Sequence, residues 1–212
     1  MDWKRKVSPK TISRLSLYRR LLGHSVAQRI DRIYSHELAR CAGISAAQVR
    51  RDIMTLGYSG TPNTGYEVQA LIDNISEHID APEGQQVALV GVGNLGQALL
   101  SYFSTGRRTN LRIVAAFDTA STKTGRVLYG CRCYRPEEMA QVAQRERISV
   151  GIIAVPAEAA QETADQLVQA GATGILNFAP VPIKVPAGVY VENMEITIKL
   201  ETVAFFARER AE

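Results

Sequence analysis

The sequence predicts an α/β protein, with an N-terminal winged helix-turn-helix domain, a Rossmann-like doubly wound parallel sheet and a C-terminal helix. An apolar run ends in the G-x-G-x-x-G pattern of Gly91, Gly93 and Gly96, and strand-like and helix-like segments then alternate. Up to residue 56, 12 Lys or Arg stand against four acids, a net charge of +8, whereas the rest carries 13 against 17, a net charge of −4. The expected domains are residues 1–80, 85–194 and 195–212.

Composition favours a soluble protein of a reducing compartment. Of the 212 residues, 46% are hydrophobic, which is ample for a packed core. No apolar run approaches the ~20 residues that a membrane span needs. The three cysteines, Cys41, Cys131 and Cys133, are odd in number and have no C-x-x-C spacing, so neither a disulfide framework nor a zinc site is indicated. We therefore expect a cytoplasmic protein with no membrane contact and no metal.

The basic N-terminal segment predicts a helix-turn-helix. Helical apolar spacing covers residues 11–22, a short helix covers residues 35–41, and a glycine-containing turn covers residues 42–44. Ser45 is the expected N-cap of the third helix. Residues 57–65, rich in glycine and polar residues, would form the wing. This order is typical of domains that place the third helix in the major groove of DNA.

The outward face of this domain carries the expected DNA contacts. Val49, Ile53 and Leu56 share the inward face of the third helix, while the first helix leaves Arg14 and its other arginines for solvent or phosphate. Gln48 has two open interpretations, because it would either complete a capping box with the N-cap or read a base. The candidate DNA-binding residues are Lys10, Arg14, Ser45, Ala47, Gln48, Arg50 and Arg51.

After an amphipathic helix over residues 68–79, residues 81–84 are the expected domain boundary. Buried strands are expected over residues 87–90, 111–117, 149–155 and 174–178. Residues 127–134 are expected to be extended, with Cys131 and Cys133 on one face. Helices are expected over residues 97–103, 136–145 and 159–170. Such alternation predicts a parallel sheet with its ligand site at the strand carboxyl ends.

The glycine pattern predicts a dinucleotide site. The first glycine permits the turn, the second lets the backbone approach a pyrophosphate, and the third lets helix and strand pack closely. Asp118, at the end of the second strand, is placed to accept hydrogen bonds from a ribose. The loops after the next strands complete the site. The candidate cofactor residues are Gly91, Val92, Gly93, Asn94, Leu95, Gly96, Asp118, Val155, Pro156, Asn177 and Phe178.

A final helix is expected over residues 195–208, and its apolar residues cover much of its circumference. So wide an apolar face at the end of a chain predicts burial against another subunit.

Together these motifs resemble the Rex family of bacterial redox-sensing transcriptional repressors, and the resemblance spans nearly the whole chain. It is carried, in order, by RLSLYRRLL, SHELARCAGISAAQVRRDI, GYEV, GVGNLGQAL, AVPAEAAQ, ILNFAPV and VENME. The resemblance implies a repressor of the NADH/NAD⁺-sensing kind. It would be a homodimer with exchanged C-terminal helices, bound to an inverted-repeat DNA operator and released when NADH replaces NAD⁺.

The same resemblance assigns roles residue by residue. Asp118, Pro156, Phe178 and the three motif glycines would line the dinucleotide, whereas Arg14, Gln48, Arg50 and Arg51 would meet DNA. Tyr102 matches a tyrosine at the cofactor site that pairs with an acid of the partner subunit. Glu195 and Ile196 would form the rest of this switch.

The chain departs from the family pattern at three places. The wing reads Thr61-Pro62-Asn63-Thr64 where the family usually has Lys or Arg, which removes a phosphate contact. Glu195 and Ile196 replace an Asp-Phe pair whose Phe reaches the partner's nicotinamide site. Lys123 and Arg126 follow Asp118 and could tolerate a 2′-phosphate.

Two other classes stay open from sequence. An NAD-dependent enzyme needs a proton-transfer residue beside the nicotinamide, and no His or Lys stands at the strand ends, so we expect no enzyme. A nucleotide or CoA-binding module would share the sheet, but the basic helix-turn-helix argues against it.

Overall fold

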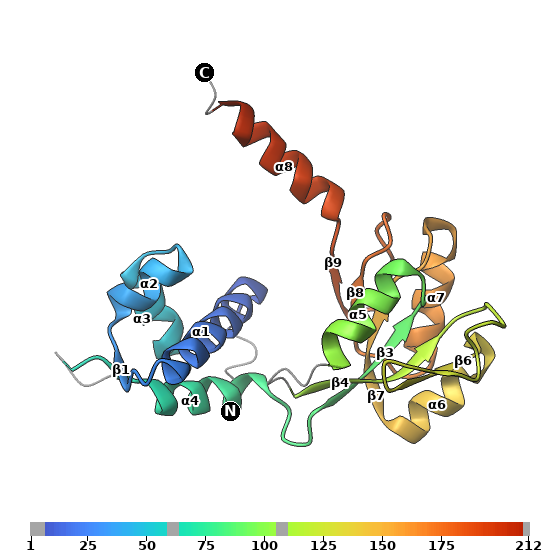
Figure 1. The fold of residues 1–212 in the computed structure, drawn as a ribbon, viewed down its shortest axis with the longest axis horizontal. Helices are drawn as coiled ribbons and strands as arrows, with labels where there is room; N and C mark the ends of the chain where they lie inside the picture. The colour runs from blue at the N-terminus through green and yellow to red at the C-terminus, as the bar shows by residue number, and fades with distance from the viewer. Residues whose placement is uncertain (1–6, 59–63, 105–109, 210–212) are drawn as a thin grey trace. The chain divides into compact units, whose positions relative to one another are not determined.

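The computed structural model describes residues 7–58, 64–104 and 110–209. The chain divides into two compact units, residues 1–82 and 83–212, and the division falls inside segment 81–84, between α4 (Val68–Ile79) and β3 (Gln85–Val90) (Figure 1). Each unit has its own buried core.

The first unit is helical, with one short antiparallel strand pair. Ser8 caps the first helix by accepting from the Thr11 N–H, and Gly43 ends the second in the left-handed region, at a φ of 67°. The elements are α1 (Pro9–Ala27), β1 (Arg32–Ile33), α2 (Ser35–Ala42), α3 (Ala46–Thr55), β2 (Tyr66–Glu67) and α4 (Val68–Ile79). The predicted helix-turn-helix is confirmed in α2 and α3.

The core of this unit joins α1, α3 and α4. Its fully buried side chains include Leu15, Tyr18, Val49, Ile53 and Leu71, and the predicted inward face of α3 is therefore confirmed. Of the predicted wing, residues 59–63, which include Thr61, Pro62 and Asn63, lie outside the described residues. β2 follows that segment and pairs antiparallel with β1.

Among the described residues, the second unit contains a seven-stranded sheet in the order β5-β6-β4-β3-β7-β8-β9. Neighbouring strands are parallel except for β5 and β6. The strands are β3 (Gln85–Val90), β4 (Leu111–Phe117), β5 (Val127–Leu128), β6 (Cys131–Tyr134), β7 (Ile148–Ile153), β8 (Gly174–Asn177) and β9 (Tyr190–Asn193). The helices are α5 (Asn94–Ser104), α6 (Met139–Glu146) after a 3₁₀ turn (Pro136–Glu138), α7 (Ala157–Gln169) and α8 (Ile196–Glu209).

Helices cover both faces of this sheet (Figure 1). Val87 and Leu89 of β3 pack with Leu100 of α5, whereas Ala88 and Val90 pack in the cluster built by α6 and α7. Because successive strand residues point to opposite faces, a strand covered on both sides is apolar at every position. The predicted doubly wound parallel sheet is confirmed.

Two details of the sheet differ from the sequence analysis. The extended segment 127–134 is a hairpin, because Tyr129 and Gly130 adopt φ values of 51° and 79° and turn the chain back. β9, which pairs with β8, was not predicted. Cys131 and Cys133 share a buried face as expected, and burial raises the pKa of both thiols, that of Cys131 to about 11. A protonated, buried thiol is a packing residue.

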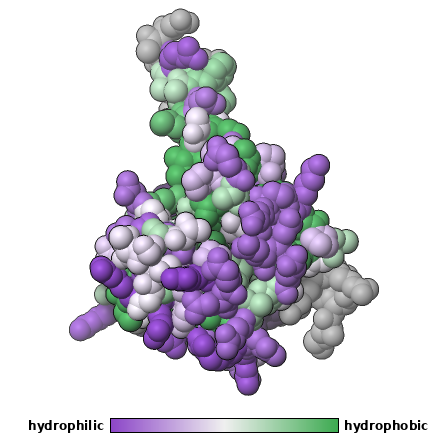
Figure 2. Space-filling view, turned by 90° about the vertical axis from the view of Figure 1, so that its right-hand side faces the viewer, coloured by the Kyte–Doolittle hydropathy of each residue, from purple (hydrophilic) through white to green (hydrophobic). Residues whose placement is uncertain are grey.

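α8 is the exposed helix of the second unit. All of its side chains from residue 196 to residue 208 are exposed, including Ile196 at 61% and Leu200 at 65%. Figure 2 shows hydrophobic side chains along this helix, at the top of the view. Within the described part of the chain, no helix is long and apolar enough to span a membrane.

Candidate functional site

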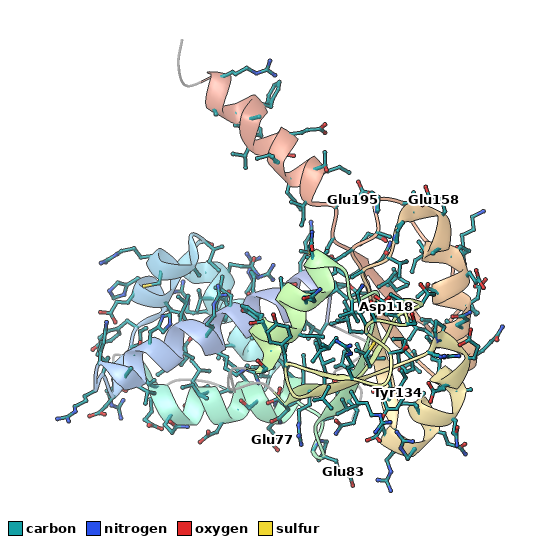
Figure 3. All side chains as sticks on the ribbon, turned by 45° about the vertical axis from the view of Figure 1, so that its right-hand side comes forward. Glu77, Glu83, Asp118, Tyr134, Glu158 and Glu195 are labelled. Carbon is teal, nitrogen blue, oxygen red and sulfur yellow. The ribbon has the colours of Figure 1, made fainter. Side chains whose placement is uncertain are left out.

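The carboxyl ends of the parallel strands lie along one edge of the sheet. There, the residues that follow each strand still donate backbone hydrogen bonds to the neighbouring strand. The bonds run from Gly91 to Phe117 (2.8 Å), Asp118 to Tyr134 (3.1 Å), Ala154 to Val90 (2.8 Å) and Phe178 to Ile153 (2.9 Å). The cofactor residues predicted after the first, second, third and fourth strands therefore share this edge, and Figure 3 labels Asp118 within it.

The three motif glycines are required for different reasons. A methyl group on Gly91 would overlap the carbonyl oxygen of Ala154, and one on Gly96 would overlap the carbonyl oxygen of Gly91. These two glycines let β3, β7 and α5 approach closely. A methyl group on Gly93 would meet no protein atom within 4 Å. Since the fold leaves that space open, Gly93 offers room for a ligand, as a pyrophosphate-binding loop does.

Asp118 ties the second strand to the glycine loop. One carboxylate oxygen accepts from the Val92 N–H (2.8 Å) and from the Lys123 ammonium (3.0 Å), and the other accepts from the Ala120 N–H (2.8 Å). Burial alone would raise the pKa of Asp118, but these hydrogen bonds outweigh it and the pKa lies below its usual value. The carboxylate is therefore ionised at neutral pH.

The loop after β8 is held by Asn177, whose side chain is 0% exposed. Its Nδ2 donates to the Val181 carbonyl (2.8 Å) and to Oδ1 of Asn193 (2.9 Å), and its own Oδ1 accepts from the Ala179 N–H (3.0 Å). All of its polar atoms are thus used inside the protein. The Asn177 side chain therefore shapes the loop that carries Phe178, and the expectation that Asn177 belongs to the cofactor site stays a prediction.

The other predicted cofactor residues surround this edge. Val92 is buried, Asn94 and Leu95 are exposed in the first turn of α5, and Val155 and Pro156 precede α7. Early N–H groups of a helix have no acceptor within it, so the start of α5 is suited to an anion. Farther along α5, the exposed Tyr102 ring contacts Phe103 edge-on, with 5.2 Å between centroids.

Glu195 stands between the sheet edge and α8 (Figure 3). The Met194 N–H donates to the Asn177 carbonyl (2.8 Å) and extends the β8–β9 ladder, and the Lys199 N–H donates to the Glu195 carbonyl (3.3 Å) in the first turn of α8. Ile196 is exposed. The described residues contain no group of three or more His, Cys, Asp or Glu suited to a metal.

In the first unit, α3 presents the predicted DNA-contact residues. Ser45, Ala47, Arg50 and Arg51 are exposed, as is Lys10 in the first turn of α1. The predicted N-cap is confirmed, because Ser45 Oγ accepts from the Gln48 N–H (3.2 Å). Among these exposed side chains, Lys10, Arg50 and Arg51 carry a positive charge.

Two expectations about side chains are corrected here. Gln48 does not complete a capping box, because its side-chain amide donates to Asp52 (2.8 Å) and accepts from Arg51 (3.0 Å). Arg14 does not point freely to solvent or phosphate, since its guanidinium forms two hydrogen bonds with Asp52 (2.6 and 2.7 Å) and is 25% exposed. Arg19 pairs likewise with Asp80 (2.7 Å).

Asp52 is the residue that the sequence analysis missed. It stands one position before Ile53 in α3, and its residue is only 2% exposed. The available signal was its spacing: Asp52 lies three residues after Val49, on the inward face of the helix, where a carboxylate requires buried donors.

A basic helix-turn-helix joined to a dinucleotide-type Rossmann sheet defines a ligand-responsive DNA-binding protein. The chain is 41% identical to the redox-sensing transcriptional repressor Rex of Pelotomaculum thermopropionicum, over 94% of this chain and 93% of that protein. It therefore belongs to the Rex family of redox-sensing transcriptional repressors. The Rex protein of Leuconostoc citreum is 39% identical, over 97% of this chain and 95% of the relative.

Each half of the chain also matches a domain family. Residues 6–53 match the family described as putative DNA-binding protein N-terminus, and residues 82–181 match the CoA binding domain. The two Rex relatives are named as transcriptional repressors rather than enzymes, which supports the expectation that the chain is not an enzyme.

Solved structures agree over nearly the whole chain. RSP in complex with β-NAD⁺ and operator DNA superimposes with a TM-score of 0.87 at 32% identity, covering 97% of this chain and 94% of that one. RSP in complex with β-NADH gives a TM-score of 0.84 at 32% identity, covering 97% and 96%. A further RSP structure is described as a Rex-family repressor.

The contrast between Gly93 and Gly96 gives a first prediction. Gly93→Ala should weaken binding of NADH at least about tenfold, or ~1.4 kcal/mol, because the methyl group occupies the open space, while the free energy of unfolding changes by less than ~1 kcal/mol. Gly96→Ala should instead destabilise the second unit by ~1–3 kcal/mol through overpacking. Calorimetric titration and thermal unfolding measure the two effects. Unchanged NADH affinity in Gly93→Ala would remove this loop from the site.

Proposed function

We propose that this chain is a homodimeric cytoplasmic repressor that binds an inverted-repeat operator and leaves it when NADH binds. The observation that carries the proposal is the open position at Gly93, in a chain whose other unit exposes a basic recognition helix. The loop has room for a pyrophosphate, and the carboxylate that would receive the ribose is ionised and fixed. The RSP structures with NAD⁺, NADH and operator DNA support the same assignment.

The cofactor lies across the strand ends in this proposal. The backbone of residues 91–96 receives the pyrophosphate, and Asp118 accepts from the ribose of the adenosine half. The nicotinamide half lies toward β7 and β8. Its neighbours are Val155, Pro156, Phe178 and Tyr102, with Asn177 acting through the loop.

The DNA contacts divide by chemistry. Lys10 and Ser45 approach phosphates, which fix the register of the helix on the duplex, whereas the Arg14 guanidinium is held by Asp52. Ala47, Gln48, Arg50 and Arg51 face the major groove, where Arg reads guanine and Gln reads adenine. A dimer places two such helices at a multiple of the helical repeat, so the operator is an inverted repeat.

The switch uses the charge of the nicotinamide ring. NAD⁺ carries a positive ring and NADH a neutral one, so a site beside Phe178 and the partner's Ile196 accepts the neutral ring at lower cost. Tyr102 and the partner's Glu195 form a contact that exists in one of the two states. NADH would have to shift the ratio of the conformation that cannot bind DNA to the one that can from 1:99 to 99:1. Such a shift requires about 5.5 kcal/mol of differential binding, or roughly half of that from each of two sites.

DNA binding in the presence of each nucleotide tests this proposal. The chain first selects its best inverted repeat from a pool of randomised duplexes. A fluorescent duplex with this repeat is then titrated with the protein, and fluorescence anisotropy measures binding. We expect NADH to weaken binding at least about tenfold and NAD⁺ to leave it within a few-fold. NADPH and CoA serve as controls, the latter because of the CoA-type sheet. An operator titration unmoved by millimolar NADH would contradict the switch.

The environment of Asp118 predicts selection of NADH over NADPH. The ionised carboxylate would repel a 2′-phosphate, so NADH should bind at least about tenfold more tightly. Lys123→Ala should widen the difference, because the ammonium 3.0 Å from the carboxylate is lost. Isothermal titration with both nucleotides measures the ratio. Equal affinities in the unmodified chain would show that Lys123 and Arg126 override Asp118.

The exposed apolar face of α8 predicts that this helix holds the dimer together. Removal of residues 195–212 should leave a chain that sediments as a monomer, because an exposed apolar helix gains stability from an apolar partner surface. Binding to the inverted repeat should fall far more than binding to random DNA, since two recognition helices are no longer joined. Analytical ultracentrifugation decides the question. A truncated chain that still sediments as a dimer would refute the role of α8.

A further inference from the structure

The recognition helix contains a buried carboxylate with four hydrogen-bond donors. Asp52 Oδ2 accepts from Nε of Arg14 (2.6 Å) and from the Tyr18 hydroxyl (2.8 Å). Its Oδ1 accepts from Nη2 of Arg14 (2.7 Å) and from Nε2 of Gln48 (2.8 Å). Three of the four donors belong to two residues of α1 and the fourth to α3 itself, so Asp52 links the two helices through polar contacts.

These contacts keep Asp52 charged in spite of its burial. Burial by itself would raise the pKa of Asp52, but the hydrogen bonds from Arg14, Tyr18 and Gln48 outweigh it, and the pKa lies below its usual value. Burial and the bond to Asp52 raise the pKa of Tyr18, so its hydroxyl stays protonated as a donor.

An ionised carboxylate accepts hydrogen bonds and donates none. Gln48 must therefore turn its NH₂ group to Asp52, which leaves its carbonyl oxygen directed to the other side. There the oxygen accepts from Nη2 of Arg51 (3.0 Å). A chain of contacts thus runs from the buried carboxylate to an exposed arginine, and it fixes which end of the Gln48 amide faces outward.

We propose that Asp52 is a positioning residue for sequence readout. It is too buried to reach DNA, but it holds Gln48, and through Gln48 it holds Arg51, in the orientation in which both meet base edges. A side chain ordered before binding loses less conformational entropy in the complex and presents one donor-acceptor pattern. The inference rests on the proposed base contacts of Gln48 and Arg51.

A purely structural role for Asp52 makes a different prediction. If Asp52 only joined α1 to α3, its loss would reduce the folded fraction, and operator and random DNA would be affected alike. A positioning role changes the ratio of the two affinities, because phosphate contacts contribute to both duplexes and base contacts to the operator alone. The ratio therefore separates the two roles.

Asp52→Asn is the direct test. One carboxylate oxygen becomes an NH₂ group that faces another donor, so Arg14 and Gln48 can no longer both be satisfied. The ratio of random-DNA Kd to operator Kd should fall roughly tenfold, while random-DNA affinity stays within about twofold. Asp73→Asn is the charge-matched control, since Asp73 is an exposed residue of α4 bonded to Gln69. Its ratio should stay within about twofold of the unmodified chain.

Two further variants separate instability from misorientation. Tyr18→Phe removes one donor from Oδ2 and leaves the Gln48 bond to Oδ1, so it should lower the melting temperature with the ratio within about twofold. Arg14→Lys keeps the charge but loses the bidentate pair of hydrogen bonds to the Asp52 carboxylate, so the ratio should fall severalfold. This variant also decides the question should Asp52→Asn fail to fold.

The outcomes are distinct. An unmodified chain that does not prefer the selected operator over random DNA would refute the proposed function itself. If the unmodified chain does prefer the operator, the variants decide the role of Asp52. An unchanged ratio of random-DNA Kd to operator Kd in folded Asp52→Asn or Arg14→Lys would overturn the positioning role. A fall in both affinities by the same factor would overturn it as well.

Discussion

The sheet edge depends on the close approach of three backbone segments around Gly91. The Ala154 carbonyl fills the space that a Gly91 side chain would need, and the Gly91 carbonyl fills the space that a Gly96 side chain would need. β3, β7 and the start of α5 are therefore packed as closely as backbone allows. Asp118 adds a hydrogen bond from the second strand to Val92. Of the three motif glycines, Gly93 faces open space.

Each unit contains one carboxylate that organises its binding surface. Asp52 and Asp118 are both largely withdrawn from water, and each is held by several donors that keep it ionised. Loss of one hydrogen-bond donor to such a carboxylate destabilises the protein strongly, because it leaves a buried charge without a partner. The same cost makes them effective at fixing geometry. Asp52 orders side chains on a recognition helix, whereas Asp118 orders a loop.

Periodicity and glycine spacing were sufficient to predict most of the fold. The inward face of α3 and the alternation within β3 follow directly from which residues are apolar. β9 was missed because Tyr190 and Glu192 face outward there and leave no continuous apolar run. The roles of Asp52, Arg14 and Asn177 could not be predicted, since each depends on partners 16 to 38 positions away. Sequence spacing shows which face a polar residue occupies, but the fold supplies its donors.

The position of α8 links assembly to the sheet edge. Glu195 follows β9 by two residues, and the Met194 N–H still bonds to Asn177 in the loop that carries Phe178. α8 begins at the next residue, so its first turn directly follows the strand ends that the cofactor occupies in the proposed function. A fourteen-residue helix is marginal alone in water, and α8 has its apolar side chains exposed. An apolar surface that covers α8 would therefore stabilise it, and in the proposed homodimer that surface belongs to the second copy of the chain.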